Sequence, residues 1–131
     1  MVATDSQTSV CQDVTVFLDG SGSASITAGD VDGGSTDNCA ITSQSVTPSS
    51  FNCSNTGANT VTLTNTDGSG NTSTCTATVT VNDSTAPTAV CQNITVSLDG
   101  SGNASITGAD LDGGSTDNCS IVSQTASPSS F

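Results

Sequence analysis

The chain has 131 residues, and its twelve acidic side chains, all Asp, are accompanied by no Lys, Arg or His, which gives a formal net charge of −12. Nucleic acid is excluded as an expected partner because binding to phosphate needs Lys or Arg to displace counterions, and an anionic membrane surface is disfavoured for the same reason. We do not expect an enzyme, because no His, Lys, Tyr or Arg is available as a base, an electrophile or a charge clamp.

Alternation of apolar and polar residues predicts several short β-strands. They are "VTVFL" (14–18), "ASIT" (24–27), "VTLT" (61–64) and "TATVTV" (76–81), with turn sequences at 19–22, 48–50 and 67–70. Phe17 lies on a face of the first strand that we expect to be exposed, because Ser97 takes its place in a later copy of the sequence. No segment shows a useful helical period. Short strands with regular turns predict an all-β fold of tandem immunoglobulin-like antiparallel β-sandwich modules.

An internal repeat divides the chain. Residues 11–51 recur at 91–131 with 29 identities in 41 positions and no gap, at a period of 80 residues. We therefore predict, in order, an incoming linker at 1–10, a complete module at 11–82, an interdomain linker at 83–90 and the first part of a second module at 91–131. Two explanations stay open for the second module. The chain is a segment of a longer tandem array, which we favour, or a neighbouring subunit supplies the missing strands by strand addition.

The six cysteines lie at fixed spacings, without a CxxC pair or a His for zinc, and favour a disulfide framework formed in an oxidising setting. The first and last strands of the expected sandwich run parallel, so Cys11–Cys75 is the preferred bridge and Cys39–Cys53 the second. The main rival pairing is Cys11–Cys39 with Cys53–Cys75. Under the preferred pairing two cysteines have no partner in this chain, Cys91 and Cys119.

The sequence also bears on location. No run of eighteen apolar residues is present, so we expect no transmembrane helix. The N-terminal "MVATDSQTSV" has neither the basic nor the apolar region of a signal peptide. We expect a secreted, extracellular or cell-surface protein without membrane insertion, in its mature form or as a segment of a longer protein.

Several blocks of the chain resemble one known family. "CQDVTVFLDGSG", "GSTDNC", "GANTVTLT" and "GNTSTCTATVTV" together are similar to the hyalin-type (HYR) repeats of animal adhesion proteins and large secreted bacterial surface proteins. The resemblance covers nearly the whole chain, and the combination of blocks is specific although each block alone is weak. It implies an immunoglobulin-like fold and a role in adhesion or extracellular matrix, and it implies no catalysis.

Acidic residues gather in two copies of one loop. "DVDGGSTDNC" (30–39) and "DLDGGSTDNC" (110–119) each hold three carboxylates within eight residues. Carboxylates this close repel one another unless a cation lies among them, so we predict Ca²⁺, which takes about six to eight oxygen ligands. The candidate ligands in these loops, the last hairpin and the two linkers are Asp5, Asp30, Asp32, Asp37, Asp67, Asp83, Asp110, Asp112 and Asp117. The competing interpretation is an ordinary solvated acidic turn, to which we assign Asp19 and Asp99.

Ser and Thr make up 46 of the 131 residues and are expected to form an uncharged coat on the strands. Such a coat could carry glycans. "DST" (83–85) resembles a bacterial O-glycosylation motif, with Ser84 and Thr85 as acceptors, and Asn71 and Asn93 are candidates among six N-x-S/T sequons.

These features lead to two hypotheses about function. The first is a structural extracellular protein that forms a fibre or stalk with further copies of the same repeat, with calcium-stiffened module junctions and a glycan coat. The second is a calcium-dependent adhesin module that binds glycan or a surface receptor. We favour the first, because the candidate ligands fall at module junctions and the chain has no aromatic recognition patch.

Overall fold

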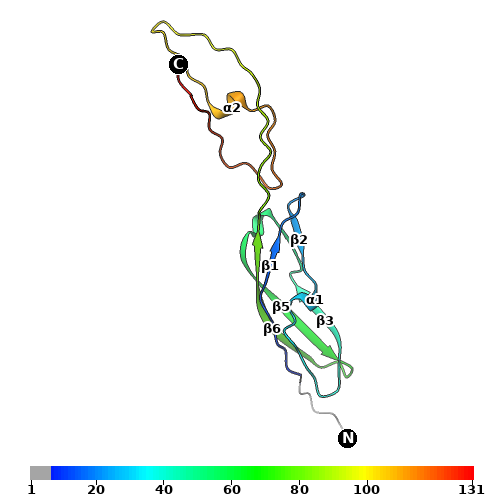
Figure 1. Ribbon diagram of the computed structural model, residues 1–131. Helices are drawn as coiled ribbons and strands as arrows, with labels where there is room; N and C mark the ends of the chain where they lie inside the picture. Colours follow the sequence, from blue (N-terminus) through cyan, green and yellow to red (C-terminus); the bar gives the residue numbers. More distant parts are fainter. Residues whose placement is uncertain (1–6) are drawn as a thin grey trace. The chain divides into compact units, whose positions relative to one another are not determined.

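The structure, a computed structural model, describes residues 7–131 and separates the chain into two compact units, Met1–Ser84 and Thr85–Phe131 (Figure 1). The boundary between the units falls inside the linker predicted at 83–90. Within the described residues, none of the helices has the length and apolar character needed to cross a membrane.

The first unit is rich in β-structure, as the alternating sequence predicts. Its elements are β1 (Val14–Phe17), β2 (Ser23–Ser25), α1 (Ala28–Val31), β3 (Ile41–Thr47), β4 (Ser50–Asn52), the 3₁₀ turn η1 (Cys53–Asn55), β5 (Gly57–Asp67) and β6 (Thr72–Asn82). A four-stranded sheet has the order β1-β6-β5-β3, and β2 pairs with β4 in a second, two-stranded sheet. The sequence does not reveal β3 and β4, because they contain few apolar residues, or α1, because one turn is too short to show a helical period.

The antiparallel hairpin β5–β6 supplies most of the core. Its register runs from Gly57 opposite Val81 to Thr66 opposite Thr72. Apolar residues at alternate positions face inward and are buried, namely Val61, Leu63, Ala77, Val79 and Val81. The core is completed from the first half of the unit by Leu18, Ile26, Val31 and Phe51. The intervening Thr residues stay partly accessible, so the period of two in the sequence determines which face is buried.

β1 lies at the edge of the larger sheet and runs parallel to β6, with Val14 opposite Val79 and Phe17 opposite Asn82. The side chain of Phe17 is 58% exposed, which confirms the face assigned to it from the Ser97 exchange.

The preferred disulfide between Cys11 and Cys75 is present, with the two Cα atoms 5.9 Å apart. It joins the segment that leads into β1 to the adjacent, parallel strand β6. The rival pairing is therefore wrong, because it joins Cys11 to Cys39 and Cys75 to Cys53.

The predicted Cys39–Cys53 bridge is wrong, because Cys39 is a free, exposed thiol while Cys53 is disulfide-bonded. Cys39 precedes β3 and Cys53 follows β4, so the seven residues of β3 separate them. At roughly 3.3 Å per residue that strand spans about 23 Å, far beyond the roughly 6 Å between the Cα atoms of a disulfide. Spacing in the sequence alone does not show that the two cysteines lie at opposite ends of β3.

The second unit keeps the local structure of the sequence that it repeats. The isolated bridges Thr88↔Thr116 and Cys91↔Asp112 correspond to Thr8↔Thr36 and Cys11↔Asp32 in the first unit. The helical turn α2 (Gly108–Leu111) corresponds to α1. Cys91 is a free, exposed thiol, as expected. Cys119 is disulfide-bonded, although it was expected to have no partner in this chain. The prediction was wrong because it considered only a counterpart of Cys53 as the partner of Cys119.

Some residues of both predicted linkers form hydrogen bonds with the unit that follows them. Of the residues assigned to the first linker, Thr8 pairs with Thr36, and the Ser9 hydroxyl lies 2.6 Å from that of Ser73 in β6. In the second linker Val90 accepts a 2.7 Å hydrogen bond from the Gly113 N–H. The segment before each repeat is therefore part of the unit that follows it.

Candidate functional site

The first carboxylate of each acidic loop, Asp30 or Asp110, caps the N-terminus of a helical turn. Oδ2 of Asp30 accepts a 2.8 Å hydrogen bond from the Thr27 N–H, and Oδ2 of Asp110 accepts one of 2.9 Å from the Thr107 N–H. Each of these carboxylates satisfies a backbone donor at the N-terminus of α1 or α2. Neither needs an ion to explain its position.

The carboxylate of Asp32 stabilises the turn that follows it in the first loop. Its Oδ1 accepts hydrogen bonds from the backbone N–H groups of Ser35 (2.8 Å) and Gly34 (3.2 Å). Gly34 has φ of +111°, which a residue with a side chain rarely adopts. The hydrogen bond from the Ser35 N–H is the largest cause that lowers the pKa of Asp32, to about 2. The carboxylate is thus held in its charged form by donors within its own loop.

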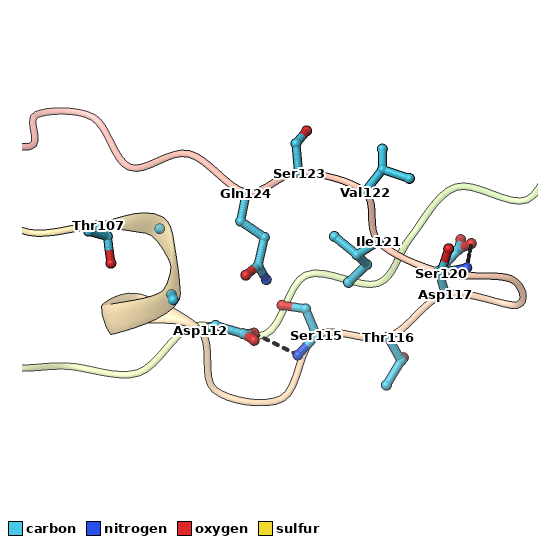
Figure 2. A pocket seen from close by; sticks show the side chains of 12 residues that line it. Thr107, Asp112, Ser115, Thr116, Asp117, Ser120, Ile121, Val122, Ser123 and Gln124 are labelled. Atoms are coloured by element: carbon cyan, nitrogen blue, oxygen red, sulfur yellow. Dashed lines mark hydrogen bonds between the residues drawn. The ribbon is translucent and has the colours of Figure 1, made fainter.

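The Ser35 hydroxyl connects this loop to the incoming chain, because it accepts from the Val10 N–H (3.0 Å) and donates to the Val10 carbonyl (3.2 Å). The second loop has the same arrangement: the Ser115 N–H donates to Oδ1 of Asp112 at 2.8 Å (Figure 2). The Ser115 N–H also lowers the pKa of Asp112 to about 2. The loop is therefore a repeated structural unit that fixes the segment before each repeat.

Asp37 and Asp117 differ from the other acidic residues. Oδ2 of Asp37 accepts from the N–H groups of Cys39 (3.1 Å) and Ala40 (3.2 Å), and Oδ2 of Asp117 accepts from those of Cys119 (3.0 Å) and Ser120 (3.1 Å), the last visible in Figure 2. The other oxygen, Oδ1, is buried in both residues. In residues 7–131 it has no hydrogen-bond donor in either copy.

Asp67 sits in the turn between β5 and β6, and its side chain is 8% exposed. Its Oδ1 accepts from the N–H groups of Ser69 and Asn71, both at 2.9 Å, and its Oδ2 accepts from the Asn71 side-chain amide at 3.1 Å. Burial acts to raise the pKa of Asp67, but these hydrogen bonds outweigh it and the pKa is lowered. Both oxygens of the Asp67 carboxylate therefore accept hydrogen bonds within the hairpin turn.

Within each unit taken by itself, the described acidic residues do not converge in the way that the sequence predicts. Within either unit taken alone, no three of the described acidic or cysteine side chains bring ligand atoms within 4.8 Å of one another. The physical reason is that the carboxylates of the two loops and of the β5–β6 turn accept from N–H groups two to four residues away in their own turns. Asp83 is exposed just after β6, and Asp5 lies outside the described residues.

The glycosylation candidates differ in accessibility. Ser84, Thr85 and Asn93 are exposed, as a modified residue must be. The amide of Asn71, in contrast, donates to Asp67 in the β5–β6 turn. Attachment of a glycan there would require that hydrogen bond to break.

A buried polar group in the hairpin does not appear among the sequence predictions. Asn65 is fully buried, its Oδ1 accepts from the Gln44 amide (2.9 Å), and its Nδ2 donates to the Ser9 hydroxyl (2.9 Å). Because Asn65 continues the inward positions Val61 and Leu63 of β5, the period of two could have located it. Its partners come from β3 and the incoming segment, so it ties three parts of the unit together.

Comparisons of the chain with protein-family models, curated proteins and solved structures gave no match. The function must therefore be argued from the chain's own geometry and from the resemblance of its sequence blocks.

Proposed function

We propose that the chain forms part of an extracellular fibre or stalk built from tandem immunoglobulin-like modules of the hyalin-repeat type. Support comes from the 80-residue sequence repeat and from a long-range disulfide, which is typical of proteins in oxidising surroundings. In this proposal the larger sheet and the β2–β4 pair of the first unit are the two layers of one sandwich.

The observation that carries the proposal is the path of the chain through the first unit. The chain enters beside the β5–β6 turn, where the Gln7 amide donates to the Asn71 carbonyl at 3.0 Å. It leaves after Asn82, at the other end of β6. β6 has 11 residues, which span about 36 Å at roughly 3.3 Å per residue. A force along the chain therefore acts on opposite ends of this unit.

The Cys11–Cys75 disulfide carries such a force directly from the incoming segment to β6. The two cysteines are 64 positions apart in sequence, so the covalent path bypasses β1, α1, β3 and β5. The parallel pairing of β1 with β6 adds hydrogen bonds that lie across the direction of pulling. A unit that keeps its length under load suits a fibre or stalk.

Single-molecule pulling on the full chain, held at its two termini, tests this role. Reduction should lengthen the unfolded chain by at least about 22 nm, because the separation of 64 residues in the bypassed loop corresponds to roughly 3.5 Å per residue when extended. A Cys39→Ser variant should behave as the parent chain, since Cys39 is a free thiol. Equal lengths for the oxidised and reduced chains would show that the disulfide does not carry the load.

Calcium is part of the proposal because of one atom that recurs in both repeats, Oδ1 of Asp37 and of Asp117. A buried carboxylate oxygen without a donor has a high free-energy cost unless a cation compensates it. A hard cation that accepts carboxylate, carbonyl and water oxygens together fits this position. These two residues are therefore the ligands that the proposal retains from the larger predicted set.

A further inference from the structure

The larger sheet of the first unit carries a regular array of hydroxyl side chains on its outer face. Where the neighbouring strands β3, β5 and β6 pair side by side, Thr and Ser fall opposite one another in three rows of three. These nine residues are named the hydroxyl grid. Its rows are Ser43, Thr66 and Thr72, then Ser45, Thr64 and Thr74, then Thr47, Thr62 and Thr76.

The hydroxyl grid faces away from the core. The residues that alternate with it, such as Leu63 and Asn65 in β5 and Ala77 in β6, are buried. Successive side chains of a strand point to opposite faces, so the grid residues point outward. All nine are exposed or half-buried. Every strand of the grid lies in the first unit, so the face is complete within that unit.

The register makes the spacing of the grid uniform. In an antiparallel pair the two kinds of opposed residue pair alternate, so all pairs on one face are of the same kind and have the same separation. Successive rows are two residues apart, about 6.8 Å, and neighbouring strands are about 4.8 Å apart. Seven of the nine residues are Thr, whose branched side chain has a restricted χ1. The hydroxyl and methyl groups therefore repeat with the backbone in two dimensions.

The composition of the grid is also selective. It contains no charged and no aromatic residue, although the chain has twelve Asp and three Phe. Strand propensity would equally favour Val, Ile or Tyr at these positions, and solubility would favour charged residues. Neither explains a face made only of hydroxyl residues. The grid fits a partner that is uncharged, periodic in two dimensions and built from hydrogen-bonding groups.

The surface of crystalline water has these three properties. Each hydroxyl of the grid offers one donor and two acceptor positions, so it can hold a water molecule in an ordered layer. The spacings of the grid, about 6.8 and 4.8 Å, are close to the two repeat distances of hexagonal ice. The methyl groups form no hydrogen bonds that compete with those within the layer. A surface that the sheet already holds in order loses little conformational entropy on binding.

We propose that the hydroxyl grid binds the surface of ice. Bound chains occupy positions at which water would otherwise add to the crystal, so the crystal grows more slowly there. The site lies on the first unit alone and requires neither a fibre role nor calcium.

Ice growth in a solution of the full chain tests the proposal. The experiment uses the chain with its Cys11–Cys75 disulfide intact, in EDTA, so that no divalent cation contributes. A single ice crystal held slightly below its melting point should stop growing and develop facets. Ice grown slowly from the same solution should take up the chain, as gel electrophoresis of the melted ice and of the remaining liquid would measure.

Matched variants locate the binding surface. Thr64→Tyr places a ring at the centre of the grid, where it prevents close approach to a crystal, and should abolish both the facets and the uptake into ice. Ser25→Tyr makes the same kind of change at an exposed position of β2, in the other sheet, and should leave both unchanged. Tyr is favoured in strands, and circular dichroism checks that each variant is folded. If Thr64→Tyr does not fold, Thr74→Tyr at an exposed grid position of β6 takes its place.

Four results would overturn the proposal. The first is a parent chain that is excluded from ice and leaves the crystal unfaceted. The second is uptake into ice that survives Thr64→Tyr or Thr74→Tyr in a folded chain, or that is lost equally in Ser25→Tyr. The third is a dimer that light scattering detects in the parent and not in Thr64→Tyr, because a second copy would then cover the grid. The fourth is grid-dependent binding to crystalline cellulose without an effect on ice.

Discussion

Cys11 and Cys75 place their Cα atoms 5.9 Å apart although 64 positions separate them in the sequence. The bridge fixes the incoming segment against β6, the strand that carries buried Ala77, Val79 and Val81. It also closes a large loop in the unfolded chain. The same covalent bond therefore links two distant parts of the folded unit and restricts the unfolded chain.

Removal of this bridge should lower the free energy of unfolding substantially. For a Cys11→Ser, Cys75→Ser double variant we expect a loss of about 4 kcal/mol, because closure of a loop of this length restricts the unfolded chain. Urea denaturation followed by circular dichroism measures the change. Cys39→Ser is the matched control, since that exposed thiol is free and its replacement should change little. Similar losses in the two variants would contradict the assignment.

Stability should fall in acid through the two loop carboxylates with strongly lowered pKa. The pKa of Asp32 is about 2 in the folded chain against an ordinary 3.8. The folded state therefore binds its proton less readily than the unfolded state, so the stabilisation is complete above pH 3.8 and is lost as pH falls toward 2. Asp112 acts in the same direction. Thermal melts between pH 2 and 6 should show this slope, and an Asp32→Asn, Asp112→Asn chain should show a smaller one; an unchanged slope would count against the loop hydrogen bonds as its cause.

The sequence predicts the hairpin well because its information is local and periodic. Thr alternates with Val and Leu along β5 and β6, and a period of two can bury only one face. The parallel first and last strands likewise predict the Cys11–Cys75 bridge. These features need only the residue order and the geometry of a sheet.

The bonds that the acidic side chains and the cysteines form are harder to predict. Each of these groups has more than one possible partner, and the order of residues does not show which one it binds. Asp32 and Asp67 could share a cation or bind nearby N–H groups, and in the structure the N–H groups of their own turns are bound. Cys39 and Cys53 are close in sequence, but β3 holds them apart. Both outcomes follow from the lengths of β3 and of the turns, and β3 has too few apolar residues to be seen as a strand.

Asn65 should be sensitive to substitution because it is fully buried and satisfied on both sides of its amide. Asn65→Ala removes the acceptor of the Gln44 amide and the donor to Ser9. We expect a loss of about 1–3 kcal/mol, because two hydrogen bonds are lost and each contributes roughly 0.5–1.5 kcal/mol. Chemical denaturation measures it, with Thr60→Ala, an exposed position on the same strand, as control. A loss no larger than that of the control would mean that this network does not stabilise the unit.

Calcium should act through Asp37 and Asp117, and the expected sign differs with and without the ion. In EDTA, the Asp37→Asn, Asp117→Asn chain should melt no lower than the parent, because the change removes buried carboxylate oxygens that have no donor among the described residues. With Ca²⁺ at 100 times its dissociation constant, each occupied site adds about 2.7 kcal/mol to the free energy of unfolding, so the parent should then melt higher than the variant. Asp19→Asn is the matched control, because the Asp19 carboxylate accepts from the Ser21 and Ser23 N–H groups in a separate exposed turn, and this variant should respond to Ca²⁺ as the parent does. Differential scanning calorimetry measures all six melts, of three chains in two conditions. A parent chain whose melting temperature is the same in EDTA and in Ca²⁺ would remove calcium from the proposed function, and the proposed role of the disulfide under load would be unaffected.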